Sequence, residues 1–348
     1  MHGPSAHEKK TSTWGKEKGC LRKAASSIPP IRLPFRRISL AFREIYRRQV
    51  QLLIRVLPSI AEEACFALKG GTAINLFVRD MPRLSVDIDL SYLPVHPRAE
   101  SLAAIDAALR RIADRIRTSI PGAQVAQTAL LPENAVYKLL ARAGGVQVKI
   151  EVTPVLRGCV YDPELRAVSP SVEEAFGFAE TRVVSLADLY AGKMGAGLDR
   201  QHPRDFFDIR GLLANEGISE PLRRAFLVYL LSHNRPLFEV LSPRIKSLQA
   251  EFRRGFLGMT PEPVPLKALI DAREALIAVA VRQMPDPHRR FLLSFEQGKP
   301  NWPLLALPGA AGLPAVRWRQ DNLDKLSSAQ RAKLASRLQA VLQNSKKK

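Results

Sequence analysis

The chain has 348 residues, with 53 Lys and Arg against 33 Asp and Glu, which gives a formal net charge of +20 at pH 7. Its hydrophobic share of 46% suits a chain that buries a core, so the composition excludes wholesale disorder and predicts a globular protein of about two domains. The longest apolar stretches are too short or too rich in proline for a membrane helix of ~20 residues, so we expect no contact with a membrane.

Charge and cysteine usage also indicate the kind of partner. A surface this positive attracts polyanions by its long-range field and by counterion release, so RNA or DNA is the first expectation, with a general solubility role as the alternative. The three cysteines, Cys20, Cys65 and Cys159, are widely spaced and lie in no Cys or His cluster. We therefore expect neither a disulfide framework nor a structural zinc site.

Residues 1–37 form the first segment of the chain. They mix Gly, Ser, Thr, Pro and Lys without apolar periodicity, which predicts a disordered basic tail. Charged residues such as Glu8, Lys9 and Lys10 stand where a secretory peptide would have its apolar run. We therefore expect the protein to remain in the cytoplasm.

Residues 38–182 are predicted to form an α/β domain. Helical spacing covers Leu40–Glu63, with a break near Pro58, and Ser101–Ile116. A further helix begins near Thr72, whose hydroxyl is a suitable N-cap, and the glycine pair before Val146 favours a hairpin turn. Short apolar runs or period-2 alternation predict strands over Cys65–Leu68, Val86–Tyr92, Gln124–Leu130, Ala135–Ala141 and Val146–Val152.

Residues 183–348 are predicted to form a mainly helical domain, because strand patterns stop after about residue 180. Proline-rich segments at Thr260–Pro265 and Asn301–Pro314 are expected to be loops. Apolar residues recur at helical spacing over Ser185–Leu198, Pro203–Leu213, Glu220–Ser232, Ala268–Val281 and Ser328–Leu342.

Two predicted strands carry carboxylates at alternate positions. In the first, Asp87 and Asp89 share the face opposite the apolar residues, roughly 7 Å apart at the backbone. Carboxylates so close suit Mg²⁺, which bridges protein oxygens to phosphates, although two solvated aspartates are the alternative. Glu151 lies on the polar face of the second strand, where it could be a metal ligand, take a proton from a hydroxyl, or pair with Lys149.

A glycine pair and an inward-facing lysine add phosphate-binding chemistry. Gly70, Gly71 and Thr72, here called the glycine corner, let backbone N–H groups approach an anion closely. Lys193 falls on the apolar stripe of its helix, so it either reaches the surface with its long stem or binds an anion. Asp205 could position Lys193 or Arg204, or could favour the N-terminus of its own helix.

The order of these motifs resembles the AbiEii/AbiGii toxin family of nucleotidyltransferases over about residues 40–215. The resemblance is carried by Leu68–Ile74, Arg83–Leu90, the strand around Glu151, Lys193, and Arg204–Asp208. It implies an α+β fold with the polymerase-β-like mixed sheet and flanking helices, followed by a mostly helical C-terminal part.

The resemblance also implies roles for individual residues. Asp87 and Asp89 match the metal-binding pair, with Glu151 where an Asp is frequent, and Asp205 matches the aspartate of the last motif. Lys193 matches the essential lysine and would complete the site from the helical domain together with Asp205. The implied nucleotide-binding residues are Lys69, Gly70, Gly71, Thr72, Ser85, Lys193 and Arg204.

The implied activity is Mg²⁺- or Mn²⁺-dependent transfer of a nucleoside monophosphate from an NTP to an acceptor hydroxyl. The basic charge favours an RNA acceptor, with the tRNA 3′ end as the expectation. The family implies a toxin–antitoxin pair in phage defence by abortive infection, with an AbiEi-like antitoxin encoded nearby. Protein nucleotidylation, kinase activity, and a non-catalytic module that binds nucleic acid or a partner are the alternatives.

Overall fold

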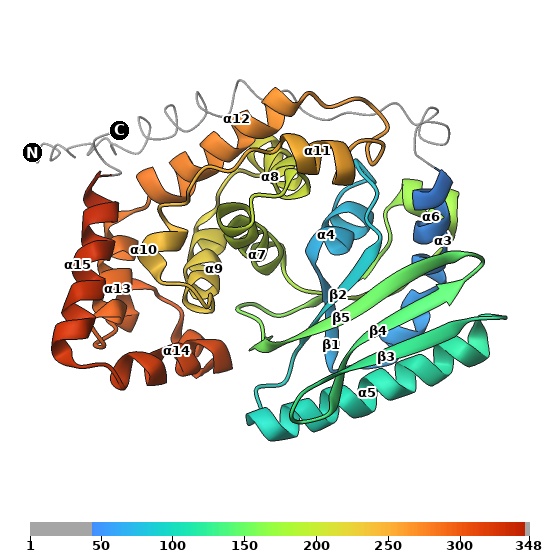
Figure 1. Cartoon of the computed structure of the whole chain (residues 1–348), viewed down its shortest axis with the longest axis horizontal. Coiled ribbons are helices and arrows are strands. Elements are labelled where there is room, and N and C mark those ends of the chain that lie inside the picture. The colour runs from blue at the N-terminus through green and yellow to red at the C-terminus, as the bar shows by residue number, and fades with distance from the viewer. Residues whose placement is uncertain (1–43, 345–348) are drawn as a thin grey trace, which may run out of the picture.

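The structure is a computed structural model, and it describes residues 44–344 of the chain (Figure 1). The predicted tail at residues 1–37 lies outside the described residues. The sheet half and the helical half lie side by side in Figure 1, and the chain passes from one to the other after β7.

A seven-stranded mixed sheet forms the first half, which confirms the predicted α+β class. β1 and β2 are antiparallel, whereas β2 and β5 are parallel, so the two carboxylate-bearing strands lie side by side in the middle of the sheet. The strand order is β3 (Gln124–Leu130), β4 (Ala135–Ala143), β5 (Val146–Arg157), β2 (Asp87–Tyr92), β1 (Phe66–Lys69), β7 (Glu180–Val183) and β6 (Glu164–Ala167).

Helices α3 (Glu44–Ala61) and α5 (Arg98–Ser119) pack against this sheet (Figure 1). The prediction that the first helix breaks near Pro58 was wrong, because α3 continues to Ala61. Pro58 lies in the last turn of α3, where the buried side chains of Val56 and Leu57 and their neighbours hold the helix in place. Packing therefore outweighs the hydrogen bond that proline removes.

The chain turns directly from β1 into a helix at the glycine corner. α4 (Gly70–Ala73) and the π-helical turn η3 (Ile74–Val78) follow without a loop. The prediction of Thr72 as an N-cap was wrong, because Thr72 lies inside α4 and is buried. Its hydroxyl contacts the Ser85 hydroxyl at 2.9 Å and donates to the Asp87 carbonyl, so it ties the corner to β2.

The hairpin at Gly144 and Gly145 is confirmed by the antiparallel register of β4 and β5. Strands end at Val183, close to the predicted limit, but β6 and β7 were not among the strands predicted, and β7 pairs with β1. These strands have four residues each, too few for a clear alternation. The segment between them carries α6 (Pro170–Phe176).

The second half is helical, as predicted. α7 (Leu186–Asp199), α8 (Pro203–Asn215), α9 (Glu220–Leu231), α12 (Leu266–Ile277) and α15 (Ser328–Asn344) lie where the spacing places them. The chain also forms α10 (Leu237–Val240), α11 (Gln249–Gly255), η4 (Ala278–Arg282), α13 (Asp286–Glu296), η5 (Trp302–Leu304), η6 (Pro308–Gly312) and α14 (Pro314–Asp324).

The proline-rich stretch Asn301–Pro314, predicted as a loop, contains the short helical turns η5 and η6, since proline is tolerated in a first helical turn. Across residues 44–344, the helices are all too short or too polar to cross a bilayer.

Candidate active site

Strand pairing in the middle of the sheet brings the three predicted carboxylates together. Asp87 and Asp89, here called the acidic pair, lie on the same face of β2. In the parallel register Glu151 lies opposite Asp89, which confirms that the third carboxylate stands on a neighbouring strand. Lys69 lies opposite Asp89 on the other side, in the antiparallel register with β1. Asp89 is therefore flanked by a carboxylate and an ammonium group.

Burial governs the charge state of Asp89. It raises the pKa of the Asp89 carboxyl, and the nearby Asp87 adds to this effect, while Lys69 and Lys149 oppose it. Burial also lowers the pKa of Lys69, whose Nζ donates to Thr153 Oγ1 at 3.2 Å. The acidic pair thus lies in an environment that disfavours a second negative charge unless a cation is present.

Glu151 forms the ion pair that the sequence leaves open as an alternative. Lys149 Nζ lies 3.0 Å from Glu151 Oε2, and both side chains are about one-third exposed, at 37% and 35%. Burial opposes the charge on Lys149, but its hydrogen bond to Glu151 and the field of Asp87 raise its pKa. Glu151 therefore has an existing partner and remains accessible to solvent.

Neighbouring side chains lie so close to the backbone of the glycine corner that both of its glycines are required. Gly70 has φ +76°, and a Cβ there would lie 2.6 Å from Asp89 Oδ2. A Cβ on Gly71 would lie 2.7 Å from Arg83 Nη2 and 3.1 Å from Ser85 Oγ. Any larger residue would push against the acidic pair or against the buried Arg83, so the corner packs directly on the candidate site.

Lys193 on α7 is buried rather than extended to the surface. Its Nζ lies 3.2 Å from Asp205 Oδ1 and 3.0 Å from Asp208 Oδ2, both on α8. Arg200 also binds Asp205, through Nε and Nη2 at 2.7 Å each. Burial opposes the charge on Asp205, but Lys193 and Arg200 together hold the pKa of this carboxyl well below its usual range. Asp205 thus binds Lys193, as one of the two predictions for it proposed.

Arg204, the other cation considered as a partner of Asp205, does not bind this carboxylate. Within residues 44–344 its guanidinium makes no ion pair or side-chain hydrogen bond, and burial together with the charge of Arg83 lowers its pKa. The charge of Asp87 acts in the opposite direction and favours the charged guanidinium. Burial lowers the pKa of His202 to about 4, so this ring is neutral at pH 7 and its Nδ1 accepts from the Arg204 backbone N–H. Arg204 is therefore a partly buried cation available to an anion.

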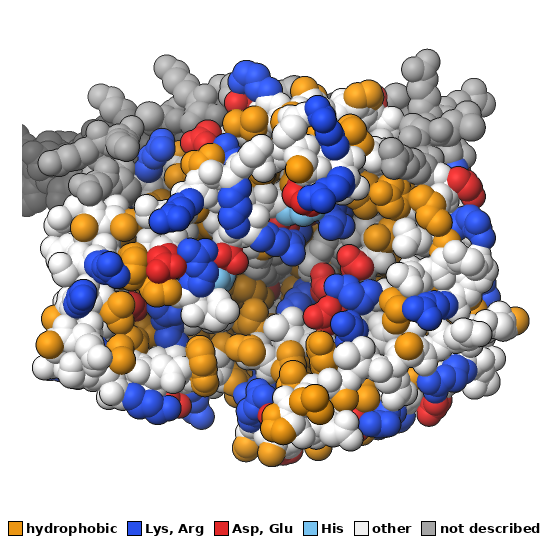
Figure 2. All heavy atoms as spheres, in the orientation of Figure 1, with side chains coloured by type: hydrophobic (Ala, Val, Ile, Leu, Met, Phe, Trp, Pro, Cys, Tyr) orange, Lys and Arg blue, Asp and Glu red, His pale blue; other side chains and the backbone are white. Residues whose placement is uncertain are grey.

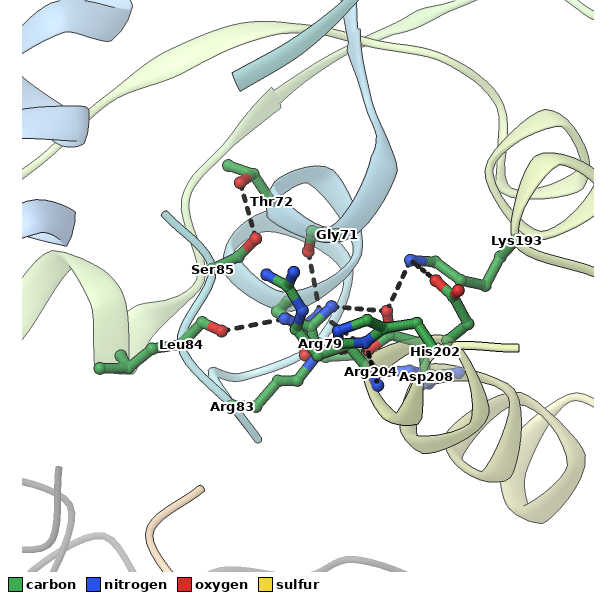
Figure 3. A network of polar contacts seen from close by, with 12 residues as sticks. Gly71, Thr72, Arg79, Arg83, Leu84, Ser85, Lys193, His202, Arg204 and Asp208 are labelled. Carbon is green, nitrogen blue, oxygen red and sulfur yellow. Dashed lines mark hydrogen bonds and ion pairs between the residues drawn. The ribbon is translucent and has the colours of Figure 1, made fainter. Parts of the chain in front are cut away.

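Arg83 and Asn75 are among the site residues that were not predicted from the sequence. Arg83 is buried and binds Asp208 through Nε at 2.8 Å and Nη2 at 2.6 Å (Figure 3). Asn75 donates to the same carboxylate at 3.0 Å. An Arg placed between two apolar segments was the available indication, but burial of an arginine depends on a partner distant in the chain.

The sheet half and the helical half face each other at this point. Burial raises the pKa of Asp89, and the charge of Lys193 opposes this rise. Asp89 in turn adds to the rise in the pKa of Arg200 that Asp205 causes first. Figure 2 shows a hollow near the middle of this face, bordered by acidic and basic side chains, between the sheet and α7 and α8. Gly70 packs on Asp89 and the charge of Lys193 acts on the same carboxyl, so the corner, the acidic pair and the lysine gather where the two halves meet.

The donor set suits a cation that is shared with a substrate. Among residues 44–344, no group of three or more His, Cys, Asp or Glu side chains is arranged to enclose a metal ion. Asp87 and Asp89 supply two carboxylates on one face, and Mg²⁺ is commonly bound by one or two carboxylates plus substrate phosphates. The acidic pair therefore fits a divalent cation that a bound triphosphate helps to hold.

Comparison with known proteins identifies the family of the chain. The model of a family described as nucleotidyl transferase AbiEii toxin, type IV toxin–antitoxin system, matches residues 51–322. This match makes the protein a nucleotidyltransferase toxin. The chain belongs to the AbiEii family of type IV toxin–antitoxin systems.

A similar solved structure supports the fold. MenT4, a nucleotidyltransferase toxin from Mycobacterium tuberculosis H37Rv, superposes with a TM-score of 0.50 at 16% sequence identity. The match covers 94% of this chain and 98% of MenT4. A search among curated proteins found no match.

Proposed function

We propose that the protein transfers a nucleoside monophosphate from an NTP to the 3′ hydroxyl of a tRNA, with Mg²⁺ or Mn²⁺. The observation that carries the proposal is the buried Lys193, held by Asp205 and Asp208 and near enough to Asp89 for its charge to act on that carboxyl. Buried cations beside paired carboxylates supply the two kinds of group that a triphosphate and its metal need.

The triphosphate is bound by cations and by the glycine corner. Lys193 and Arg204 hold phosphate oxygens from the helical side, while Gly70, Gly71 and Thr72 approach from the sheet side. Lys69 and Ser85 border the corner, and Ser85 orients Thr72 through their hydroxyl contact. These contacts align the α-phosphorus for attack in line with its leaving group.

In the transfer step, the acceptor oxygen forms a bond to the α-phosphorus as the bond to the bridging oxygen breaks, and pyrophosphate leaves. The hydroxyl proton passes to Glu151, the partly exposed carboxylate opposite Asp89. Asp87 and Asp89 would hold a divalent cation, which would neutralise charge at the phosphates. Lys193 balances the charge that develops on the pyrophosphate.

The helical half provides a surface for the acceptor. Arg244, Lys246, Arg253 and Arg254, here called the cationic rim, are exposed on the loop before α11 and on α11 itself. Gln201 ties this loop to the start of α8, since it donates to the Arg244 carbonyl at 2.6 Å and accepts from the Lys246 N–H at 3.1 Å. Such a rim beside the site matches the charge of an RNA backbone.

The proposal is tested by incubating the purified protein with Mg²⁺, total tRNA and each NTP labelled at the α-phosphate. We expect label in the tRNA band from at least one NTP, lost in Asp87→Ala. The absence of transfer with every NTP would refute the proposal. Label in a protein band would indicate protein nucleotidylation, and transfer from γ-labelled nucleotide would indicate a kinase.

The biological role is tested in cells. We expect expression to arrest growth, a co-expressed AbiEi-like antitoxin to relieve the arrest, and the pair to limit phage infection. Toxicity and RNA binding that both survive in Asp87→Ala would instead indicate a non-catalytic binding module.

A further inference from the structure

The carboxylate of Asp208 is shared by groups from η3, from the connection between η3 and β2, and from α7 (Figure 3). Lys193 Nζ lies 3.0 Å from Oδ2, and Arg83 binds both oxygens as a two-pronged donor. Asn75 Nδ2 donates to Asp208 Oδ1 at 3.0 Å and to the Gly71 carbonyl at 2.8 Å. A continuous series of polar contacts therefore runs from the glycine corner through Asp208 to the lysine.

Arg83 connects the same two places by a second route. Gly71 packs so closely on the Arg83 guanidinium that a Cβ there would lie 2.7 Å from Nη2. Arg83 Nη1 donates to the Leu84 carbonyl at 2.9 Å, and the side chain is 2% exposed. Because the donors of this planar guanidinium are fixed, the Asp208 carboxylate can bind both of them in only one orientation.

Asp205 and Asp208, the two carboxylates that bind Lys193, differ in their other hydrogen-bond partners. Asp205 is bound by Arg200, whose side chain is 62% exposed. Asp208 is bound, among the described residues, by Arg83 and Asn75, which both pack on the glycine corner. Of these two carboxylates, Asp208 is thus the one that links the position of Lys193 to that of the corner.

We propose that Arg83 and Asp208 are positioning residues that fix the Lys193 ammonium relative to the glycine corner. The inference rests on the proposed function, in which Lys193 and the corner hold the same triphosphate. An ammonium displaced by about 1 Å would weaken interactions that are strongest in the transition state, which can cost up to about 100-fold in rate.

The chain offers a matched control in a second ion pair. Arg79 binds Glu216 through Nη1 at 2.8 Å and through Nη2, and its Nε contacts the Tyr190 hydroxyl at 3.2 Å. This pair also joins the β1–β2 connection to α8, at the end of α8 remote from Lys193. Substitutions at Arg79 therefore weaken the same packing without touching the lysine.

The test is a double-mutant cycle on nucleotide transfer. We expect Arg83→Lys, which keeps the charge but loses the two-pronged geometry, to lower kcat about tenfold with less than a threefold change in the KM for NTP. In a Lys193→Gln background the same substitution should lower kcat less than twofold, because its effect passes through Lys193. Equal factors in both backgrounds, or an equal loss in Arg79→Lys, would overturn the inference.

A second measurement does not require transfer activity. A nucleoside acyl-phosphate probe acylates a lysine amine beside the bound phosphates, and mass spectrometry quantifies the labelled peptide. We expect labelling of Lys193 in the wild type and in Arg79→Lys, and at least a fivefold slower labelling in Arg83→Lys and Asn75→Ala. Equal labelling in all four proteins, or none in the wild type, would overturn the inference. A wild type that is labelled but transfers nothing would refute the proposed function alone.

Discussion

At the scale of the residue, Asp89 combines a structural cost with a functional use. Burial and Asp87 raise its pKa, so the ionised carboxylate disfavours the folded state in the absence of a cation. Because the folded-state pKa lies above the unfolded one, this cost is present above the folded pKa and disappears as the pH falls through it. A cation bound beside Asp89 would therefore stabilise the folded state.

We predict that Asp89→Asn will lower nucleotide transfer by at least about 100-fold, because the amide cannot hold the cation that offsets phosphate charge. The metal-free variant should be as stable as the wild type, or more stable, at pH 7. Differential scanning calorimetry should show Mg²⁺ raising the Tm of the wild type but not of the variant. A large loss of stability in Asp89→Asn would contradict this account of its electrostatics.

Lys193 and the glycine corner show how much of the environment of single residues could be predicted from the sequence. Lys193 was expected to face inward from its place on an apolar stripe, and it does. The glycine corner was expected to allow close approach, and at Gly70 this approach is to Asp89. The partner of Asp205 besides Lys193 is Arg200 and not Arg204, because the choice between two arginines four residues apart depends on how α7 ends and α8 begins.

At the scale of the element, α8 is the helix that joins the two halves of the site. It carries Asp205 and Asp208 one turn apart on its buried side, so one helix face holds Lys193. Burial opposes the charge of Asp208, but Arg83 and Lys193 together keep its pKa below the ordinary value. The folded state thus depends on this carboxylate being ionised.

We predict that Asp208→Asn will lower the free energy of unfolding at pH 7 by about 3–5 kcal/mol, because it leaves Arg83 buried without its counter-charge. The stabilisation is present above the unfolded pKa of about 4 and is lost as the pH falls further, through the folded pKa. Urea unfolding should therefore show the two proteins converging below about pH 4.

The control for this prediction is Glu216→Gln, which breaks a more exposed pair on the same helix. It should cost no more than about 1 kcal/mol. A difference between wild type and Asp208→Asn that stays constant down to acid pH would show that ionisation of this carboxyl is not the cause.

At the scale of the whole molecule, two halves that are separate in sequence form one site. The sheet supplies the acidic pair and the corner, and the helical half supplies Lys193, Arg204 and the cationic rim. Figure 2 shows basic side chains above the hollow, in the region of α11. In the proposed function, this position of the rim would bring the backbone of an extended polyanion near the acidic pair.

We predict that a double charge reversal in the rim, Arg244→Glu with Arg253→Glu, will raise the KM for tRNA about tenfold and leave the KM for NTP unchanged. The slope of log K for tRNA binding against log[salt] should become shallower by about one unit for each phosphate that the variant no longer binds. The control is Arg290→Glu with Lys333→Glu on α13 and α15, which lie at the opposite side of the helical half (Figure 1). An equal effect of both pairs would indicate that only net charge matters.

Most of the chemistry could be predicted from the sequence because it follows local periods. Alternation with period two places Asp87 and Asp89 on one face, and helical spacing directs Lys193 inward. The class of fold and the family also follow from motif order along the chain.

The pairings could not be predicted, because they join residues that are distant in sequence and depend on packing between elements. Burial of Arg83 against Asp208, the strand β7 beside β1, and the unbroken helix through Pro58 all depend on contacts made only after the chain has folded. A short-range pattern therefore shows which groups are available, whereas long-range packing selects which of them meet.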